Sequence, residues 1–197
     1  METLEAIASR RSIRKYLPRE VSDELVEKIV RAGMLAPSAK NRQPWSFVAV
    51  KGEAKEEMLQ CFRQGILREQ TGNAVLPGSK RHLPGAEYTV KILEEAPVSI
   101  WIVNPLGTCD TAMDEEGYFY EIANVQSVGA AVENMALAAA SLGLGSLWIC
   151  DIFFAYEELS RWLGAGGKLM AALALGYPAE QPSARPRKPF SQVFQWK

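Results

Sequence analysis

Two clusters of basic residues lie near opposite ends of the 197-residue chain, RRSIR at positions 10–14 and RPRK at positions 185–188. Guanidinium groups form charge-assisted hydrogen bonds with phosphate or carboxylate, and a serine adds a hydroxyl. The alternatives are a solvated basic turn and a disordered proline-rich C-terminus. Against disorder, the last eight residues include Phe190, Val193, Phe194 and Trp196, which a free tail would expose to water. The candidate anion-binding residues are Arg10, Arg11, Ser12, Arg14, Arg185, Arg187 and Lys188.

A third group of polar side chains occupies the segment PSAKNRQPW at positions 37–45, which has a proline near each end. Amide and hydroxyl groups in such a loop match the donor and acceptor edge of a flat heterocycle. The alternative is a polar connecting loop with Trp45 in the core. The candidate binding residues here are Pro37, Ser38, Ala39, Asn41 and Gln43.

A fourth segment, GLGSLWICD at positions 143–151, contains two glycines but is not a dinucleotide fingerprint. The G-x-G-x-x-G spacing fails, and the glycines precede a predicted strand instead of following it. A helix cap followed by a core strand explains residues 143–149. Only the backbone after Trp148, at Cys150 and Asp151, is therefore a functional candidate.

The composition excludes several classes of protein. Lys and Arg number 22 and Asp and Glu 23, so the chain lacks the positive excess of a general nucleic-acid binder. Three separated cysteines and a single histidine, His82, argue against a metal site or a disulfide framework and fit a reducing compartment. No signal peptide and no apolar stretch long enough to span a bilayer is evident. We expect a cytoplasmic protein that binds neither nucleic acid nor membrane.

The periodicity of apolar residues predicts one α+β or α/β domain over residues 1–197. The strongest element is a helix over residues 118–142, apolar on nearly all sides and rich in Ala and Gly, which should lie in the middle of the protein. Residues 72–85, which include Arg81 and His82, are expected to form a loop or lid. The tail, residues 180–197, should be extended. Further helices are expected near residues 4–8, 22–36, 58–66 and 156–163, and strands at 45–50, 98–103, 147–149 and 169–175.

Taken together and in this order, the four motifs resemble those of the nitroreductase family of flavin-dependent oxidoreductases. The resemblance covers nearly the whole chain, most loosely over residues 70–95. It implies an α+β fold, a three-layer α/β/α sandwich with a mainly antiparallel sheet and a long central helix. It also implies a homodimer with two FMN sites at the interface, on which the basic tail packs.

The resemblance implies a role for each candidate residue. The FMN phosphate would be held from both ends of the chain, and Arg14 would lie near the flavin pyrimidine. The loop at 37–43 would approach the FMN of the other subunit, and the backbone of Cys150 and Asp151 would lie near flavin N5. Many relatives have glycine at this last place, so a side chain here is a departure from the family pattern. A polar contact from the middle of the chain is left open between Gln70 and Asn73. The phosphate ligands implied are Arg10, Ser12 and Arg187, with Arg185 or Lys188.

The implied activity is ping-pong hydride transfer through flavin N5, from NADH or NADPH to a small acceptor such as a nitroaromatic or a quinone. Because the cofactor carries the redox chemistry, no catalytic acid or base is required. Arg81 and His82 are lid candidates, and His82 is more typical of a surface loop than of a proton donor. The alternatives are dehalogenation, flavin fragmentation or dehydrogenation by the same cofactor, a non-catalytic FMN-binding module, and an interaction domain without flavin.

Overall fold

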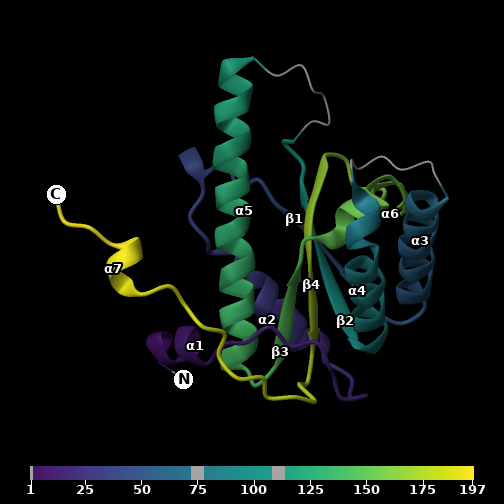
Figure 1. Ribbon diagram of the computed structural model, residues 1–197, viewed down its shortest axis with the longest axis horizontal. Helices are drawn as coiled ribbons and strands as arrows, with labels where there is room; N and C mark the ends of the chain where they lie inside the picture. The colour runs from purple at the N-terminus through teal and green to yellow at the C-terminus, as the bar shows by residue number, and fades with distance from the viewer. Residues whose placement is uncertain (1, 72–77, 108–113) are drawn as a thin grey trace.

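A four-stranded sheet forms the middle layer of the computed structural model, which describes residues 2–71, 78–107 and 114–197 (Figure 1). The strands are β1 (Ser46–Val50), β2 (Val98–Asn104), β3 (Gly145–Ile149) and β4 (Lys168–Gly176). Their order is β1-β2-β4-β3, and every neighbouring pair is antiparallel. The central strands β2 and β4 are almost entirely buried, which explains why their sequences are apolar without alternation.

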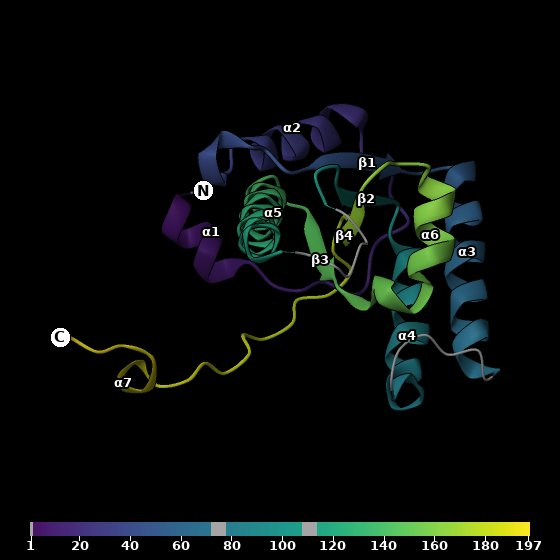
Figure 2. The same ribbon diagram turned by 90° about the horizontal axis from the view of Figure 1, so that it is seen from above.

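Helices cover both faces of the sheet, as the view from above shows (Figure 2). On one face, Ile100 and Ile102 of β2 join the core beneath α2 (Asp23–Met34) and α5 (Glu115–Ser141). On the other face, Trp101 and Val103 join the core beneath α3 (Glu53–Gln70), α4 (Leu83–Glu95) and α6 (Tyr156–Leu163). This alternation along one strand, with a helical layer on each side, confirms the predicted three-layer α+β sandwich.

The long helix α5 has 27 residues and is therefore about 40 Å long. It begins at a cap in which the Asp114 carboxylate accepts a hydrogen bond from the Gly117 N–H at 2.8 Å. It ends before Gly143, whose φ of +75° suits a residue without a side chain. One side of α5 packs on α2 and the sheet, whereas Ile122 and Val125 are exposed on another. The prediction of an apolar helix is correct, but its burial within one chain is incomplete.

The segment after α1 (Thr3–Ser9) runs along the end of the sheet formed by β3 and β4. Ser12 bridges Ser146, and Tyr16 bridges Pro178. The approach is close at Gly145, where a Cβ atom would lie 2.8 Å from the side chain of Ile13. The RRSIR segment is thus attached to the sheet edge by backbone pairing.

Two expectations about irregular segments need correction. The predicted lid at 72–85 is a 3₁₀ turn, η2 (Ser79–His82), followed by the first turn of α4, because Pro84 is compatible with the first turn of a helix. Residues 72–77, including Asn73, lie outside the described residues. The tail is extended as expected, except for one short helix, α7 (Phe190–Val193), and in both views it extends away from the body (Figures 1 and 2). Within the described ranges, no helix is long and apolar enough to cross a membrane.

Candidate functional site

The two basic clusters, about 170 positions apart in sequence, line one small cavity of about 130 Å³. The segment after α1 forms one wall, and residues 182–187 of the tail form the other. Five arginines line the same small volume, and no acidic side chain is among the described residues that line it. Such a volume suits one compact anion that accepts several charge-assisted hydrogen bonds. We call it the arginine pocket; its lining is Arg10, Arg11, Ser12, Arg14, Pro182, Ser183, Ala184, Arg185 and Arg187.

Two carboxylates that do not line the arginine pocket bind the segment that forms one of its walls. Glu180 accepts a hydrogen bond from the backbone N–H of Arg14 at 2.6 Å, and Glu133 of α5 accepts one from Nε of Arg10 at 3.1 Å. Arg11 is turned toward the end of α1, where its Nη1 donates to the carbonyl oxygen of Ala8 at 2.7 Å. Arg10 and Arg14 are therefore positioned by side chains that the sequence analysis did not select.

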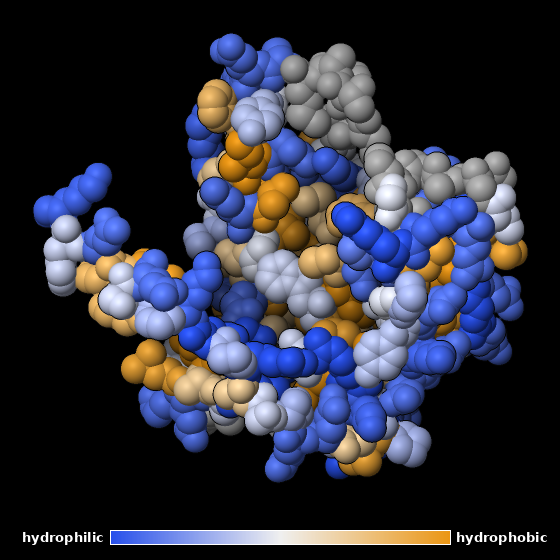
Figure 3. Space-filling model, in the orientation of Figure 1, coloured by the Kyte–Doolittle hydropathy of each residue, from blue (hydrophilic) through white to orange (hydrophobic). Residues whose placement is uncertain are grey.

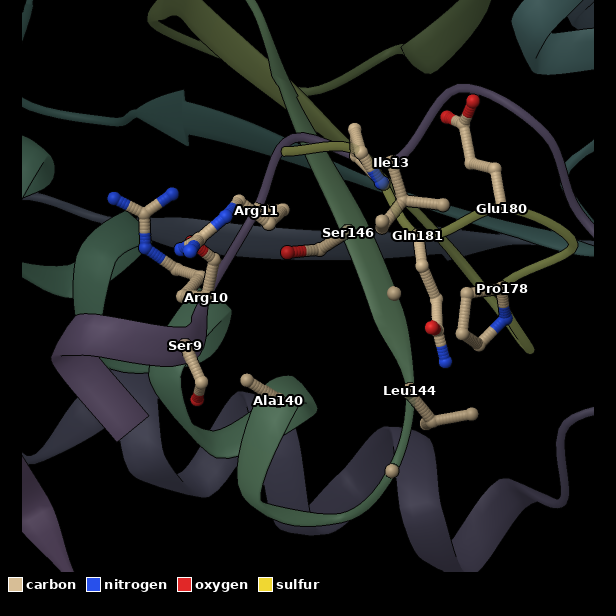
Figure 4. A pocket seen from close by; sticks show the side chains of 13 residues that line it. Ser9, Arg10, Arg11, Ile13, Ala140, Leu144, Ser146, Pro178, Glu180 and Gln181 are labelled. Atoms are coloured by element: carbon tan, nitrogen blue, oxygen red, sulfur yellow. The ribbon is translucent and has the colours of Figure 1, made fainter. Parts of the chain in front are cut away.

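A second cavity of about 400 Å³ adjoins the arginine pocket and shares Arg10, Arg11 and Pro182 with it. Figure 4 shows Arg10 and Arg11 on one side of β3 and Glu180 on the other, with Ser146 between them. The two cavities together form an elongated recess that follows the segment 9–14, and the basic side chains lie at one part of it. A ligand with an anionic end and a larger body that also makes apolar contacts fits this lining.

The loop at 37–43 has an unusual backbone. Lys40, Asn41 and Gln43 have φ values of +52°, +53° and +48°, a region that residues other than glycine adopt only with strain. The loop is pinned because Ser38 Oγ accepts a hydrogen bond from the Gln43 N–H at 3.0 Å. The Ala39 N–H approaches Ser127 Oγ of α5 at 3.4 Å. Strain held in place in this way is typical of functional segments.

A cavity of about 330 Å³ lies between this loop and α5, and the predicted residues Pro37, Ser38 and Ala39 line it. The arginine pocket lies elsewhere on α5, as two contacts show. Ser127 contacts the loop and Glu133 contacts Arg10. Side chains six positions apart leave a helix about 120° apart and about 9 Å along its axis. One chain therefore does not bring the loop and the arginine pocket together into one site.

The remaining predicted residues lie in three places. Asp151 follows β3, and its carboxylate accepts a hydrogen bond from Thr89 Oγ1 of α4 at 2.9 Å. Cys150 beside it is exposed, and partial burial of its thiol together with the Asp151 charge raises its pKa. Arg81 donates to His82 at 2.9 Å on the surface, and neither residue lines the cavities described here. Lys188 follows Arg187 in the sequence and is not among the residues that line the pocket.

The structure also identifies residues that the sequence reasoning missed. Glu133 could have been noticed, because it is the single charged residue in the part of α5 that follows Glu121. Glu180 carries no such signal, since an acidic residue in a proline-rich tail is unremarkable in sequence. Lys40 and Arg42 were passed over in favour of their neighbours, although both contact the ring of Tyr120.

Comparison with known proteins agrees with this geometry. The model of the nitroreductase family matches residues 7–177. A protein of Methanothermobacter thermautotrophicus named "Putative NADH dehydrogenase/NAD(P)H nitroreductase" is 33% identical over 189 residues, covering 94% of this chain and 82% of the relative. The NADPH-flavin oxidoreductase of Vibrio harveyi is 28% identical, covering 95% of this chain and 70% of the relative.

Solved structures agree as well. The crystal structure of a "putative nitroreductase in complex with FMN" from Desulfovibrio desulfuricans has a TM-score of 0.74 at 30% identity, covering 100% of this chain and 97% of that one. The chain belongs to the nitroreductase family. The predicted family, fold and class of enzyme are thereby confirmed, and the expected cofactors, FMN and NAD(P)H, are those named for the relatives.

Proposed function

We propose that this protein is a homodimeric, FMN-dependent NAD(P)H oxidoreductase that reduces nitroaromatics, quinones or similar small acceptors. The arginine pocket is the observation that carries the proposal. It gathers positive charge from both ends of the chain around a volume suited to one phosphate group. The names of the relatives, which include NAD(P)H nitroreductase and NADPH-flavin oxidoreductase, support the same reading.

The residues of the arginine pocket fit an FMN phosphate. Arg10, Ser12 and Arg187 offer guanidinium and hydroxyl donors, and Arg185 lines the same volume. Five arginines in one cavity repel each other, and the two carboxylates that contact their segment offset only part of that charge. A bound phosphate would offset the rest. Lys188 would add charge from its margin, and Arg14 would face the flavin pyrimidine.

The loop at 37–43 would contact the FMN held by the partner subunit. Pro37, Ser38 and Ala39 line the face of the loop that its own chain leaves open, while Asn41 and Gln43 belong to the strained backbone that keeps this face rigid. The backbone after β3, at Cys150 and Asp151, would lie near flavin N5. The bond from Thr89 to Asp151 holds this segment in place.

When bound, FMN would supply the redox chemistry, taking a hydride from NADH or NADPH and passing it to the acceptor in a ping-pong cycle. The protein residues then need only bind and orient the reactants and exclude water. A positive charge at Arg14 would stabilise negative charge on the pyrimidine side of the ring. This division of labour accounts for a chain whose single histidine, His82, lines neither the arginine pocket nor the cavity beside it.

The exposed apolar surface of α5 and of the tail supports the proposal of a homodimer. Phe119 and Val125 are 66% and 47% exposed, and Trp196 near the C-terminus is 89% exposed. Apolar surface of this kind is typical of an interface. Figure 3 shows apolar residues gathered over the part of α5 nearest its N-terminal end. A partner that covers α5 and receives the tail would bury these groups.

The direct test is anaerobic stopped-flow absorbance on the FMN-loaded protein. We expect the flavin band to bleach on addition of NADH or NADPH and to return on addition of a quinone or a nitroaromatic. A yellow protein that does not bleach would support the non-catalytic binding module. A colourless protein that is indifferent to added FMN would support an interaction domain. If the flavin band bleached but neither a quinone nor a nitroaromatic restored it, one of the alternative flavin reactions would be favoured: dehalogenation, flavin fragmentation or dehydrogenation.

A further inference from the structure

A third recess, of about 560 Å³, lies between the strained loop and the first turns of α5. It shares Ala39 and Ala123 with the cavity under Ser38, so it opens directly beside the part of the loop that the proposed function places against the flavin. We call it the lysine recess; its lining is Ala39, Lys40, Glu115, Glu116, Phe119, Tyr120 and Ala123.

Two cationic side chains, those of Lys40 and Arg42, contact the ring of Tyr120 at this recess. Nζ of Lys40 donates to the hydroxyl oxygen of Tyr120 at 3.1 Å, and Cζ of Arg42 lies 4.3 Å from the centre of the same ring. The left-handed backbone of Lys40 and Asn41 places residues 40 and 42 on the same side of the loop. A strained loop therefore presents two positive charges to one half-buried aromatic side chain.

The charge of Lys40 is maintained at neutral pH. Its hydrogen bond to Tyr120 raises the pKa of the ammonium group, and the nearby Glu116 carboxylate acts in the same direction, against the opposing effect of Arg42. The ammonium group has three donors, of which Tyr120 uses one. Two donors are left for a ligand in the recess.

The other residues that line the recess restrict the shape and the charge of a ligand. Phe119 is 66% exposed and, with Ala39 and Ala123, offers an apolar surface to a flat ring. Glu115 and Glu116 line the recess where α5 begins, so a ligand with several negative charges would be repelled there. An aromatic ring that carries one negative substituent, directed at Lys40, satisfies both constraints.

We propose that the lysine recess binds the aromatic electron acceptor and that Lys40 selects acceptors with a single anionic ring substituent, such as a carboxylate, over neutral ones. This inference rests on the proposed function, because the flavin must lie beside the loop for an acceptor bound here to be reduced. Tyr120 is the positioning residue, since it fixes Nζ of Lys40, and Phe119 provides the stacking surface.

The test compares 4-nitrobenzoate with 4-nitrobenzamide, two acceptors of similar shape that differ in charge. With the FMN-loaded protein and saturating NAD(P)H, kcat/KM should favour the benzoate. Lys40→Met should lower this preference about fivefold, the size expected for an exposed ion pair, chiefly through the KM for the benzoate. Lys40→Arg should restore it. Lys28→Met, at an exposed lysine of α2, is the matched control and should leave the preference unchanged.

Binding of unreactive benzoate and benzamide, followed by the absorbance change of oxidised flavin, separates this inference from the proposed function. Tighter binding of benzoate that Lys40→Met abolishes would support the charge selection even if turnover were absent, in which case the proposed reduction would fail alone. If the wild type showed no preference for benzoate over benzamide, or if Lys40→Met kept the wild-type preference, the inference would be overturned. The proposed reductase activity would not be affected by that result. A protein that binds no FMN would overturn both.

Discussion

The arginine pocket and the loop at 37–43 are built in opposite ways. The pocket joins the two ends of the chain, and its walls meet only because residues 12–17 and the segment after β4 pair along the sheet edge. The loop is local and complete within seven residues, held by the hydroxyl of Ser38 and by contacts with Tyr120 and Ser127 of α5. The pocket has concentrated charge and little backbone strain, whereas the loop has strain and an open face.

Under the proposed function, the two regions would be halves of one binding site. The pocket can hold the charged end of a ligand without help, since both of its walls come from the same chain. The loop lies on another side of α5, so in a homodimer its rigid face would serve the ligand that the partner subunit holds. Concentrated charge and left-handed backbone both cost folding free energy, and ligand contacts would offset these costs. The following changes test whether the two halves contribute separately.

Among the single substitutions, the largest expected effect is that of Arg10→Ala. It should weaken FMN binding by about 1.5–3 kcal/mol, the contribution of a hydrogen bond to a charged group. Riboflavin, which has no phosphate, should bind the variant and the wild type equally. Titration followed by flavin fluorescence measures both affinities. Arg161→Ala, an exposed arginine on α6, is the control. Unchanged FMN affinity in Arg10→Ala would contradict the phosphate assignment.

Two deletions of different length separate the contribution of the charged residues of the tail from that of its apolar residues. Removing residues 182–197 should weaken both FMN binding, because Arg185 and Arg187 are lost, and the dimer, because the aromatic end is lost. Removing only residues 190–197 should weaken the dimer and leave the phosphate pocket. Sedimentation velocity and flavin titration measure the two properties. Tight cofactor binding and an intact dimer in the longer deletion would show that the tail is dispensable.

Glu180→Ala should lower FMN affinity by about 1 kcal/mol, because the backbone N–H of Arg14 loses its acceptor. Glu180→Gln keeps an oxygen acceptor and should retain most of the affinity. Isothermal titration with FMN and with riboflavin measures the effect. Equal losses for the two ligands in Glu180→Ala would mean that Glu180 supports the ring and not the phosphate, which would break the assignment of this half-site.

The smallest effect is expected in the loop. Ser38→Ala removes the acceptor of the Gln43 N–H and should lower the free energy of unfolding by about 0.5–1.5 kcal/mol. If the loop serves the partner's ligand, the variant should also weaken FMN binding in the dimer. Thermal unfolding with and without FMN measures both changes. A destabilised protein with unaltered FMN binding would place the loop outside the site.

Local sequence predicted the elements well where apolar periodicity was strong. The spacing in α5 predicted a helix over 118–142, and the β-rich runs predicted β2 and β4 to within one residue at each end. The start of α4 was misread, because Pro84 and Gly85 suggested a loop although a helix tolerates proline in its first turn. Glu180 could not be selected from the sequence, since its importance comes from a contact with a residue 166 positions away.

By itself, the sequence determined the identity of the charged and polar groups, the apolar faces of the helices and strands, and the motif order typical of the family, because these depend on residue type and short-range spacing. The tertiary structure decided which groups meet. Pairing of the RRSIR segment with the sheet edge brings the tail to Arg10, and the helical twist of α5 separates that pocket from the loop. Contacts between distant segments depend on the packing of the whole chain, which no local pattern encodes.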